Sequence, residues 1–349
     1  MKAMIIKEFR ELRRDRRTVA MIVGLPILLL VIFGYAANFT VSTLSTIVVG
    51  PQATTVAAAL PHLFDVRSIE PDATSADAPT YLQDAKAQVV IDTTTTPPTA
   101  WVDGADLFQA QTAVTALAKA GGAAQTKVLF NPDLTTAWYM VPSLIGLIMT
   151  FIGTIVTSIG LVRERENGTL EQLAVMPFRP VDVIVGKIAP YFLLAAVDLV
   201  LVTGLGMLLF GVPFNGSVLV FGLGAALFLF AVLGLGVLIS TLSQNTGQAI
   251  QGAILVLLPQ VLLSGMIFPL AAMPLVIRCI SYCMPLTWFT MISRGTMLRA
   301  TPITSPAIWL PLVVLAFMAA VIFGLAVLRF RRDLAPGRRH ARTPEHVDA

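Results

Sequence analysis

Eight charged residues lie within twenty-five positions of a segment that is flanked by apolar sequence on both sides. They are Arg163, Glu164, Arg165, Glu166, Glu171, Arg179, Asp182 and Lys187. Thr169 is a favoured residue type at a helix N-terminus, and Glu171 and Gln172 would follow in the first turn. Pro177 and Pro180 would end such a helix. The segment therefore predicts a short, capped, polar helix that lies at a membrane surface.

A simpler interpretation of this segment is a solvated turn whose basic residues orient the chain. Arg163 and Lys187 fit that interpretation, because short cytoplasmic loops are enriched in Lys and Arg. The three glutamates do not fit it, since acidic residues contribute little to orientation. These glutamates are therefore the charges that point to function.

Residues suited to catalysis or metal binding are scarce elsewhere. The sequence predicts no catalytic residue and no metal ligand, and Cys279 and Cys283 are expected as free thiols. Gly186-Lys187 is the only Gly-Lys pair, and it lacks the flanking residues of a phosphate-binding loop, so no ATP site is expected in this chain. Asp198 is the only acid well inside an apolar stretch. It is either a pathway residue or a carboxylate buried against a polar partner.

The composition excludes the soluble classes. The 349 residues are 56% hydrophobic and only 13% charged, with a mean hydropathy of +0.80. Soluble proteins carry about 25% charged residues. An ordinary soluble enzyme, a disordered protein and a nucleic-acid binder are therefore excluded. Two cysteines cannot build a disulfide framework or a thiolate metal cage.

Six stretches are long and apolar enough to cross a bilayer, which takes roughly 20 helical residues. They are residues 19–38, 137–162, 187–210, 218–242, 249–268 and 307–330. A further apolar region, 267–295, is interrupted by prolines and arginines, so it predicts a broken, re-entrant outer hairpin of two short helices. The predicted fold class is an α-helical integral membrane protein with six transmembrane helices.

The distribution of basic residues predicts the orientation. Seventeen of the 24 lie before the first span, in the loop after the second span, or in the tail that includes residues 331–349. Both termini are therefore expected in the cytoplasm. The apolar run 19–38 exceeds the usual 7–15-residue core of a signal peptide, which favours an uncleaved span, although Ala36 and Ala37 leave cleavage open. The net charge of +4 thus reports topology rather than an anionic ligand.

The first 18 residues predict an amphipathic helix along the cytoplasmic membrane surface. Apolar side chains, among them Phe9, alternate with basic ones that include Arg10, Arg13 and Arg14. Attraction to anionic lipid is one interpretation of this helix, and contact with a protein is another. The two are compatible.

Residues 39–136 predict a small α/β domain on the outer side. They hold nine acidic residues against four basic ones. The short β-rich runs are 45–50, 63–69, 87–92 and 99–104, and the helical runs are 53–60, 76–87 and 105–120. The tract DTTTTPPT, at 92–99, is expected to be a solvated hairpin loop.

Two motifs resemble a known family. The segment ERENGTLEQL, followed by GKIAPY, is similar to the signature loop of type-2 ABC exporter permeases. The layout agrees, with a basic N-terminal helix, a large outer domain after the first span and a broken outer hairpin. That domain fits the drug- and antibiotic-export subgroup, and VDGADLFQAQTAVTAL resembles the last strand and helix of the subgroup's outer domain.

The resemblance implies a function and a set of partners. The chain would be a permease subunit in the bacterial plasma membrane that exports a hydrophobic or amphipathic compound by alternating access. It would act as a homodimer or related heterodimer. The loop 163–187 would be a coupling helix that contacts a separate ATPase subunit, in which ATP and Mg²⁺ bind, and the N-terminal helix would add a second contact. The implied coupling contacts are Glu164, Glu166, Gly168, Thr169, Glu171 and Leu173.

The resemblance also implies an outer gate where the fifth span breaks into the hairpin. Irregular backbone at membrane depth requires protein or a water-lined cavity around it. The expected gate residues are Pro259, Gln260, Ser264 and Pro269. A different class, a membrane-anchored sensor or assembly protein whose outer domain binds a ligand, remains as the alternative. It would not need broken helices or a capped, glutamate-rich loop.

Overall fold

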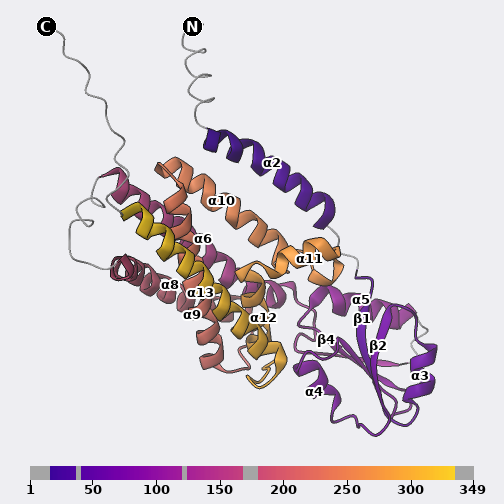
Figure 1. Ribbon diagram of the computed structural model, residues 1–349. Coiled ribbons are helices and arrows are strands. Elements are labelled where there is room, and N and C mark those ends of the chain that lie inside the picture. The colour runs from indigo at the N-terminus through magenta and orange to yellow at the C-terminus, as the bar shows by residue number, and fades with distance from the viewer. Residues whose placement is uncertain (1–15, 37–40, 120–123, 168–179, 335–349) are drawn as a thin grey trace, which may run out of the picture.

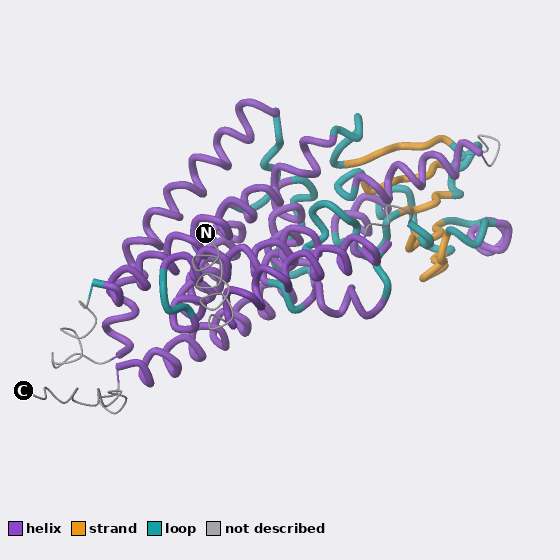
Figure 2. Tube along the Cα trace, turned by 90° about the horizontal axis from the view of Figure 1, so that it is seen from above, coloured by secondary structure: helices purple, strands orange, loops and turns teal. Residues whose placement is uncertain are grey.

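The computed structural model describes residues 16–36, 41–119, 124–167 and 180–334. Figure 1 shows a bundle of long helices with a smaller α/β domain at one end. Figure 2 shows the same division, with the strands gathered beyond one end of the helices. The long helices are α2 (Arg16–Ala36), α6 (Thr136–Glu166), α8 (Pro180–Phe210), α9 (Val218–Leu242), α10 (Thr246–Leu263) and α13 (Pro306–Leu334).

The fold class predicted from the sequence is confirmed. In the part of the chain that the structure describes, α6, α8, α9, α10 and α13 are long and apolar enough to cross a membrane. A sixth crossing is reached if the bent pair α11 (Leu275–Tyr282) and α12 (Pro285–Met297) counts as one. The apolar part of α2, Gly24–Gly34, is shorter than a full crossing. Residues 37–38 of the first expected span lie outside the described residues.

Two helices extend into the segment expected as a single loop. α6 continues through the charged residues to Glu166, and α8 begins at Pro180, before the expected start of the third span at Lys187. A polar sequence can extend a helix whose apolar part is anchored in the bundle, since the last turn needs only solvent on its outer face. Between these helices, residues 168–179 lie outside the described part of the chain.

The predicted hairpin consists of two short helices that meet at 82°. The expected fifth span reached residue 268, but α10 ends at Leu263, and Gly265 adopts a φ of +83° that an L side chain rarely takes. A 3₁₀ turn, η1 (Leu270–Ala272), precedes α11. Both hairpin cysteines, Cys279 and Cys283, are exposed free thiols.

The α/β domain contains a five-stranded sheet in the order β2-β1-β3-β4-β5. Its strands are β1 (Leu44–Val49), β2 (Phe64–Glu70), β3 (Val89–Asp92), β4 (Thr99–Asp103) and β5 (Gln125–Leu129). Only β3 and β4 pair in antiparallel fashion, and the predicted hairpin loop lies between them. The helices of the domain are α3 (Ala53–Ala59), α4 (Ala78–Gln83) and α5 (Leu107–Lys119).

Strand β5 was not predicted. Its first three residues are exposed, and its sequence, QTKVL, lacks the apolar alternation that marks a strand. It pairs in parallel with β4, so the motif at residues 102–117 covers the last helix of the domain, α5, but its strand is the fourth and not the last. β5 then leads directly towards α6.

The sheet is buried on both faces. Leu44 and Val48 pack with Ala110 of α5, whereas the alternate residues Ile47 and Val49 pack with Leu82 of α4. This division follows from the two-residue period of a strand, which sends successive side chains to opposite faces. At the end of α4, Gln83 Nε2 donates to the Ala300 carbonyl at 2.8 Å, which ties this edge of the domain to the segment that follows α12.

Close helix packing forms the bundle core. Phe228 of α9 stacks on Phe289 of α12, with ring centroids 4.6 Å apart. A Cβ atom added at Gly236 would lie 3.0 Å from the Thr154 carbonyl oxygen of α6, so this glycine permits close approach of the two helices. Gly222, by contrast, faces open space. Glycines thus permit close helix packing at some positions only.

Candidate functional site

The last turn of α6 joins this helix to three others. Three successive residues, Glu164, Arg165 and Glu166, make these contacts, and together we call them the α6 hub. Glu166 accepts hydrogen bonds from the backbone N–H of Thr246, at 2.9 Å, and from its hydroxyl, at 2.8 Å. Thr246 is the first residue of α10. Because the N-terminus of a helix carries partial positive charge, a carboxylate there is stabilising.

The other two hub residues bind α9 and α8. Arg165 donates from Nη1 to the carbonyl oxygens of Ser240, at 3.1 Å, and Ser243, at 2.9 Å, which lie at the C-terminal end of α9. A cation is stabilising at this end of a helix dipole. Glu164 forms an ion pair with Lys187 of α8. The hub therefore places opposite charges on opposite helix ends and connects α6 with α8, α9 and α10.

The turn between α9 and α10 has its own hydrogen bonds. Asn245 caps α10, and its side chain accepts from the Gln248 backbone N–H at 2.9 Å. Gln248 in turn accepts from the Gln244 backbone N–H at 3.0 Å. The turn is thus ordered around the point that Glu166 contacts.

The coupling residues implied by the resemblance fall into two groups. Glu164 and Glu166 are brought together in the α6 hub, where both have partners within the chain. The others lie outside the described residues, as do the residues of the predicted interface helix. They are Gly168, Thr169, Glu171, Leu173, Phe9, Arg10, Arg13 and Arg14.

The expected gate residues surround the break after α10. Gln260 is only 1% exposed, and neither polar atom of its side chain has a hydrogen-bond partner among the described residues. Pro259 lies within α10, and Pro269 precedes η1. The freed carbonyl of Gly265 accepts from the Tyr139 hydroxyl at 2.9 Å. Protein groups therefore receive the irregular backbone, as membrane burial requires.

Arg294 of α12 completes this arrangement, and its role was not predicted. Its Nη2 donates to the Gly265 carbonyl and its Nε to the Tyr139 carbonyl, both at 3.2 Å. The guanidinium carbon lies 3.7 Å from the centroid of the Tyr139 ring, a cation–π contact. A basic residue within an apolar stretch was the available sequence signal, but it was interpreted only as an interruption of a span.

Asp198 does not join either group. It is half-buried on α8, and its Oδ2 atom has no hydrogen-bond partner in the described ranges. The polar partner considered for this carboxylate is therefore not present at that oxygen. Its role in a pathway stays a prediction.

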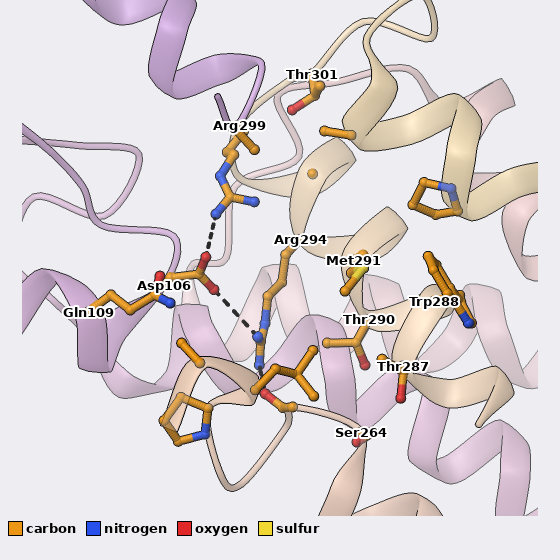
Figure 3. Close-up of a pocket in the computed structure, with 18 of the residues that line it drawn as sticks. Asp106, Gln109, Ser264, Thr287, Trp288, Thr290, Met291, Arg294, Arg299 and Thr301 are labelled. Carbon is orange, nitrogen blue, oxygen red and sulfur yellow. Dashed lines mark hydrogen bonds and ion pairs between the residues drawn. The ribbon is translucent and has the colours of Figure 1, made fainter. Parts of the chain in front are cut away.

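A cavity of about 620 Å³ separates part of the α/β domain from the bundle. Figure 3 shows Asp106 and Gln109 on one side of it and Trp288, Thr290 and Arg294 on the other. Ser264 and Pro269, two of the expected gate residues, also line it. The cavity thus lies where the end of α10, the hairpin and the α/β domain meet.

An ion-pair network ties the α/β domain to the bundle beside this cavity. Arg299, which follows α12, donates from Nε to Asp103 Oδ2 at 2.8 Å and from Nη2 to Asp106 Oδ2 at 2.7 Å. Arg294 Nη1 lies 3.7 Å from Asp106 Oδ1. Asp103 is 3% exposed and Arg299 8%, so this is a buried network. The Thr301 hydroxyl also donates a hydrogen bond to the Gln83 carbonyl at 2.6 Å, which connects α4 with the segment after α12.

Burial and charge act in opposite directions in this network. Burial is the main influence on Asp103 and raises the pKa of its carboxyl group, although the adjacent Arg299 guanidinium opposes the shift. Burial also disfavours the Arg299 charge, but the two carboxylates outweigh that effect and raise the pKa of Arg299. The guanidinium is therefore held charged, and it compensates carboxylates that would otherwise be costly to bury.

The helices, the hub and the buried ion pairs define a multi-pass membrane protein whose cavity lies between its bundle and an α/β domain. The chain belongs to the ABC-2 family of transporters, because the family model described as "ABC-2 family transporter protein" matches residues 16–328. The resemblance noted in the sequence is thereby confirmed at the level of the family.

Three curated relatives come from Escherichia coli strain K12. "Probable multidrug ABC transporter permease YbhS" is 34% identical over 212 residues, covering 60% of this chain and 55% of that protein. "Probable multidrug ABC transporter permease YbhR" is 33% identical over 205 residues, with 59% and 55% covered. "Inner membrane transport permease YhhJ" is 34% identical over 215 residues, with 60% and 56% covered. The matched part of this chain thus spans little more than half the length of each relative.

Proposed function

We propose that this chain is the permease subunit of an ATP-driven exporter in the bacterial plasma membrane. It moves hydrophobic or amphipathic compounds out of the cytoplasm or the inner leaflet by alternating access, as a dimer of permease copies. The α6 hub is the observation that carries this proposal, because it connects the polar loop to the helices of the bundle. Membership of the ABC-2 family and the multidrug names of two relatives support it.

The two ends of α6 hold both ends of α10, and this supplies a route for coupling. Glu166 binds Thr246 at the start of α10, and Tyr139 binds the Gly265 carbonyl just beyond its end. When the loop is pushed, the hub moves α10 together with α6, and the backbone break beside the cavity moves with them. A protein that served only as a membrane anchor would not need such ties.

The energy source in this proposal is a separate ATPase subunit, which holds ATP and Mg²⁺. The contacts with it are assigned to Glu171 and its neighbours in the loop and to the basic N-terminal helix. Coupling and energy supply then belong to different polypeptides. Glu164 and Glu166 act within the permease, since their carboxylates already bind Lys187 and Thr246.

Copurification tests the partnership. When the tagged chain is produced together with an ABC ATPase subunit from the same organism, we expect the two to elute together from detergent extracts. Glu171→Arg should reduce the recovered ATPase at least about 10-fold, because it reverses a charge at the proposed contact. Asp72→Arg is the matched control, since it reverses an exposed charge on the α/β domain. Recovery of no ATPase with the unaltered chain would count against the proposal.

The orientation in this proposal places the α/β domain outside the cytoplasm and both termini inside. The test uses a variant of the chain from which Cys279 and Cys283 have been removed. A cysteine introduced into it at Ala59, an exposed position on α3, should react with a membrane-impermeant maleimide in intact cells. A cysteine at Asn167, beside the α6 hub, should react only after the membrane is opened. The reverse pattern would show that the orientation is wrong.

A further inference from the structure

The lining of the cavity carries excess positive charge. Arg278, Arg294 and Arg299 contribute to it, whereas Asp106 is the one carboxylate among its lining residues. Counting the adjacent Asp103, which binds Arg299, three guanidinium groups still face two carboxylates. In surroundings of low dielectric constant, such an excess favours an anion much more strongly than it would in water. The electrostatics of the cavity therefore select for a negatively charged group.

Several hydrogen-bond donors in the cavity lack partners. Ser264 and Thr290 are 1% and 2% exposed, and neither hydroxyl has a partner in the described part of the chain. The Nε of Arg278 is buried and without a partner there as well. Buried polar groups are almost always hydrogen-bonded, and each unsatisfied group costs about 1–3 kcal/mol. An anionic oxygen within hydrogen-bond distance would accept from each of these donors.

Gln109 also lines the cavity, and its Oε1 atom, an acceptor, has no hydrogen-bond partner among the described residues. Rotation of the amide by half a turn would present its nitrogen, a donor, in the same place. This side chain can therefore adapt to an anion as well as to a bound water. It lies across the cavity from Thr290 in Figure 3.

Part of the wall of the cavity is apolar. Trp288, Met291, Leu310 and Pro311 contribute to it, and the volume of about 620 Å³ is in the range of pockets that hold small ligands. A free inorganic anion would leave this apolar surface in contact with water. We infer that the cavity binds an amphiphile with an anionic head, a phosphate or a carboxylate, and an apolar tail.

Binding to the purified full-length chain in phosphatidylcholine nanodiscs tests this inference. The probe is monododecyl phosphate, and dodecyltrimethylammonium carries the same tail with the opposite charge. We expect the phosphate to bind at least about 10-fold more tightly, after subtraction of its partition into empty nanodiscs. Equal binding of the two amphiphiles would overturn the inference.

Substitution of the unpaired hydroxyls locates the site. Thr290→Val and Ser264→Ala should each weaken binding of monododecyl phosphate about 10-fold, since a hydrogen bond to a charged group is lost. Thr154→Val is the matched control. Thr154 is fully buried, and its hydroxyl also has no hydrogen-bond partner among the described residues, but this residue does not line the cavity. Equal effects of the Thr154 and Thr290 substitutions would contradict the site.

Inorganic phosphate distinguishes a lipid-like ligand from a free anion. We expect it to bind at least about 10-fold more weakly than monododecyl phosphate, because it leaves the apolar wall uncovered. If the two phosphates bound with equal affinity, the inference of an amphiphilic ligand would be wrong, and the cavity would be a site for a free anion. These measurements need no ATPase subunit, so their failure is distinguishable from failure of the proposed export function.

Discussion

Replacement of Arg299 by methionine is expected to lower the free energy of unfolding by about 3–5 kcal/mol. The substitution keeps much of the side-chain volume but removes the charge that compensates Asp103 and Asp106. Asp103 is only 3% exposed, so solvent compensates its charge poorly once the guanidinium is lost. Chemical unfolding in detergent micelles, followed by circular dichroism, measures the change.

The loss should depend on pH in a defined direction. Burial already raises the pKa of Asp103, and removal of Arg299 would raise it further. A carboxyl group with a raised folded-state pKa favours the folded state at low pH and loses that contribution as the pH rises. The deficit of the variant should therefore be smaller at pH 5 than at pH 8.

Arg67→Met is the matched control for this prediction. Arg67 pairs with Asp65 at 2.9 Å in the same domain, but its side chain is 67% exposed. Exposed pairs contribute about 0–1 kcal/mol, so this variant should remain close to the unaltered protein. If Arg299→Met cost no more than Arg67→Met, the network would not hold the α/β domain on the bundle.

Replacement of Glu166 by alanine is expected to uncouple the loop from α10. The ATPase subunit should still copurify, but the stimulation of its ATP hydrolysis by the permease should fall about 10-fold, which corresponds to about 1.4 kcal/mol of activation free energy. The reason is that both hydrogen bonds to Thr246 are lost, while Glu171 and the other proposed contacts are unchanged.

Hydrogen exchange supplies a local measurement of the same change. The Thr246 amide should exchange faster in Glu166→Ala, because its acceptor is removed. Thr246→Val is the matched variant, since it keeps the backbone donor and removes only the hydroxyl donor, and it should show an intermediate loss of stimulation. Full stimulation in Glu166→Ala would show that the hub does not transmit motion.

The long helices could be predicted from the sequence because their signal is local. An apolar run of sufficient length leaves few alternatives in a bilayer, where each backbone group must be satisfied within its own segment. The ends were less predictable. α10 stops at Leu263, although the apolar sequence continues, because Ser264 and Gly265 allow a backbone break that Tyr139 and Arg294 then stabilise.

The candidate site depended on contacts that no local pattern encodes. Glu166 meets Thr246, 80 residues further along the chain, and Arg299 meets Asp103 across 196 residues. Charge alone singled out Glu164 and Glu166, but it could not distinguish a partner within the chain from one on another subunit. Asp103 was placed only within the β-rich run 99–104, since its buried partner was not visible in the sequence.

The central claim is that this chain is a permease whose energy comes from a separate ATPase subunit. ATP hydrolysis by purified components in nanodiscs tests it most directly. The chain alone should hydrolyse no ATP, and the ATPase subunit should hydrolyse it faster when the chain is present than when it is absent. A contradictory result would be hydrolysis by the chain alone, or a rate for the ATPase subunit that is the same with and without it.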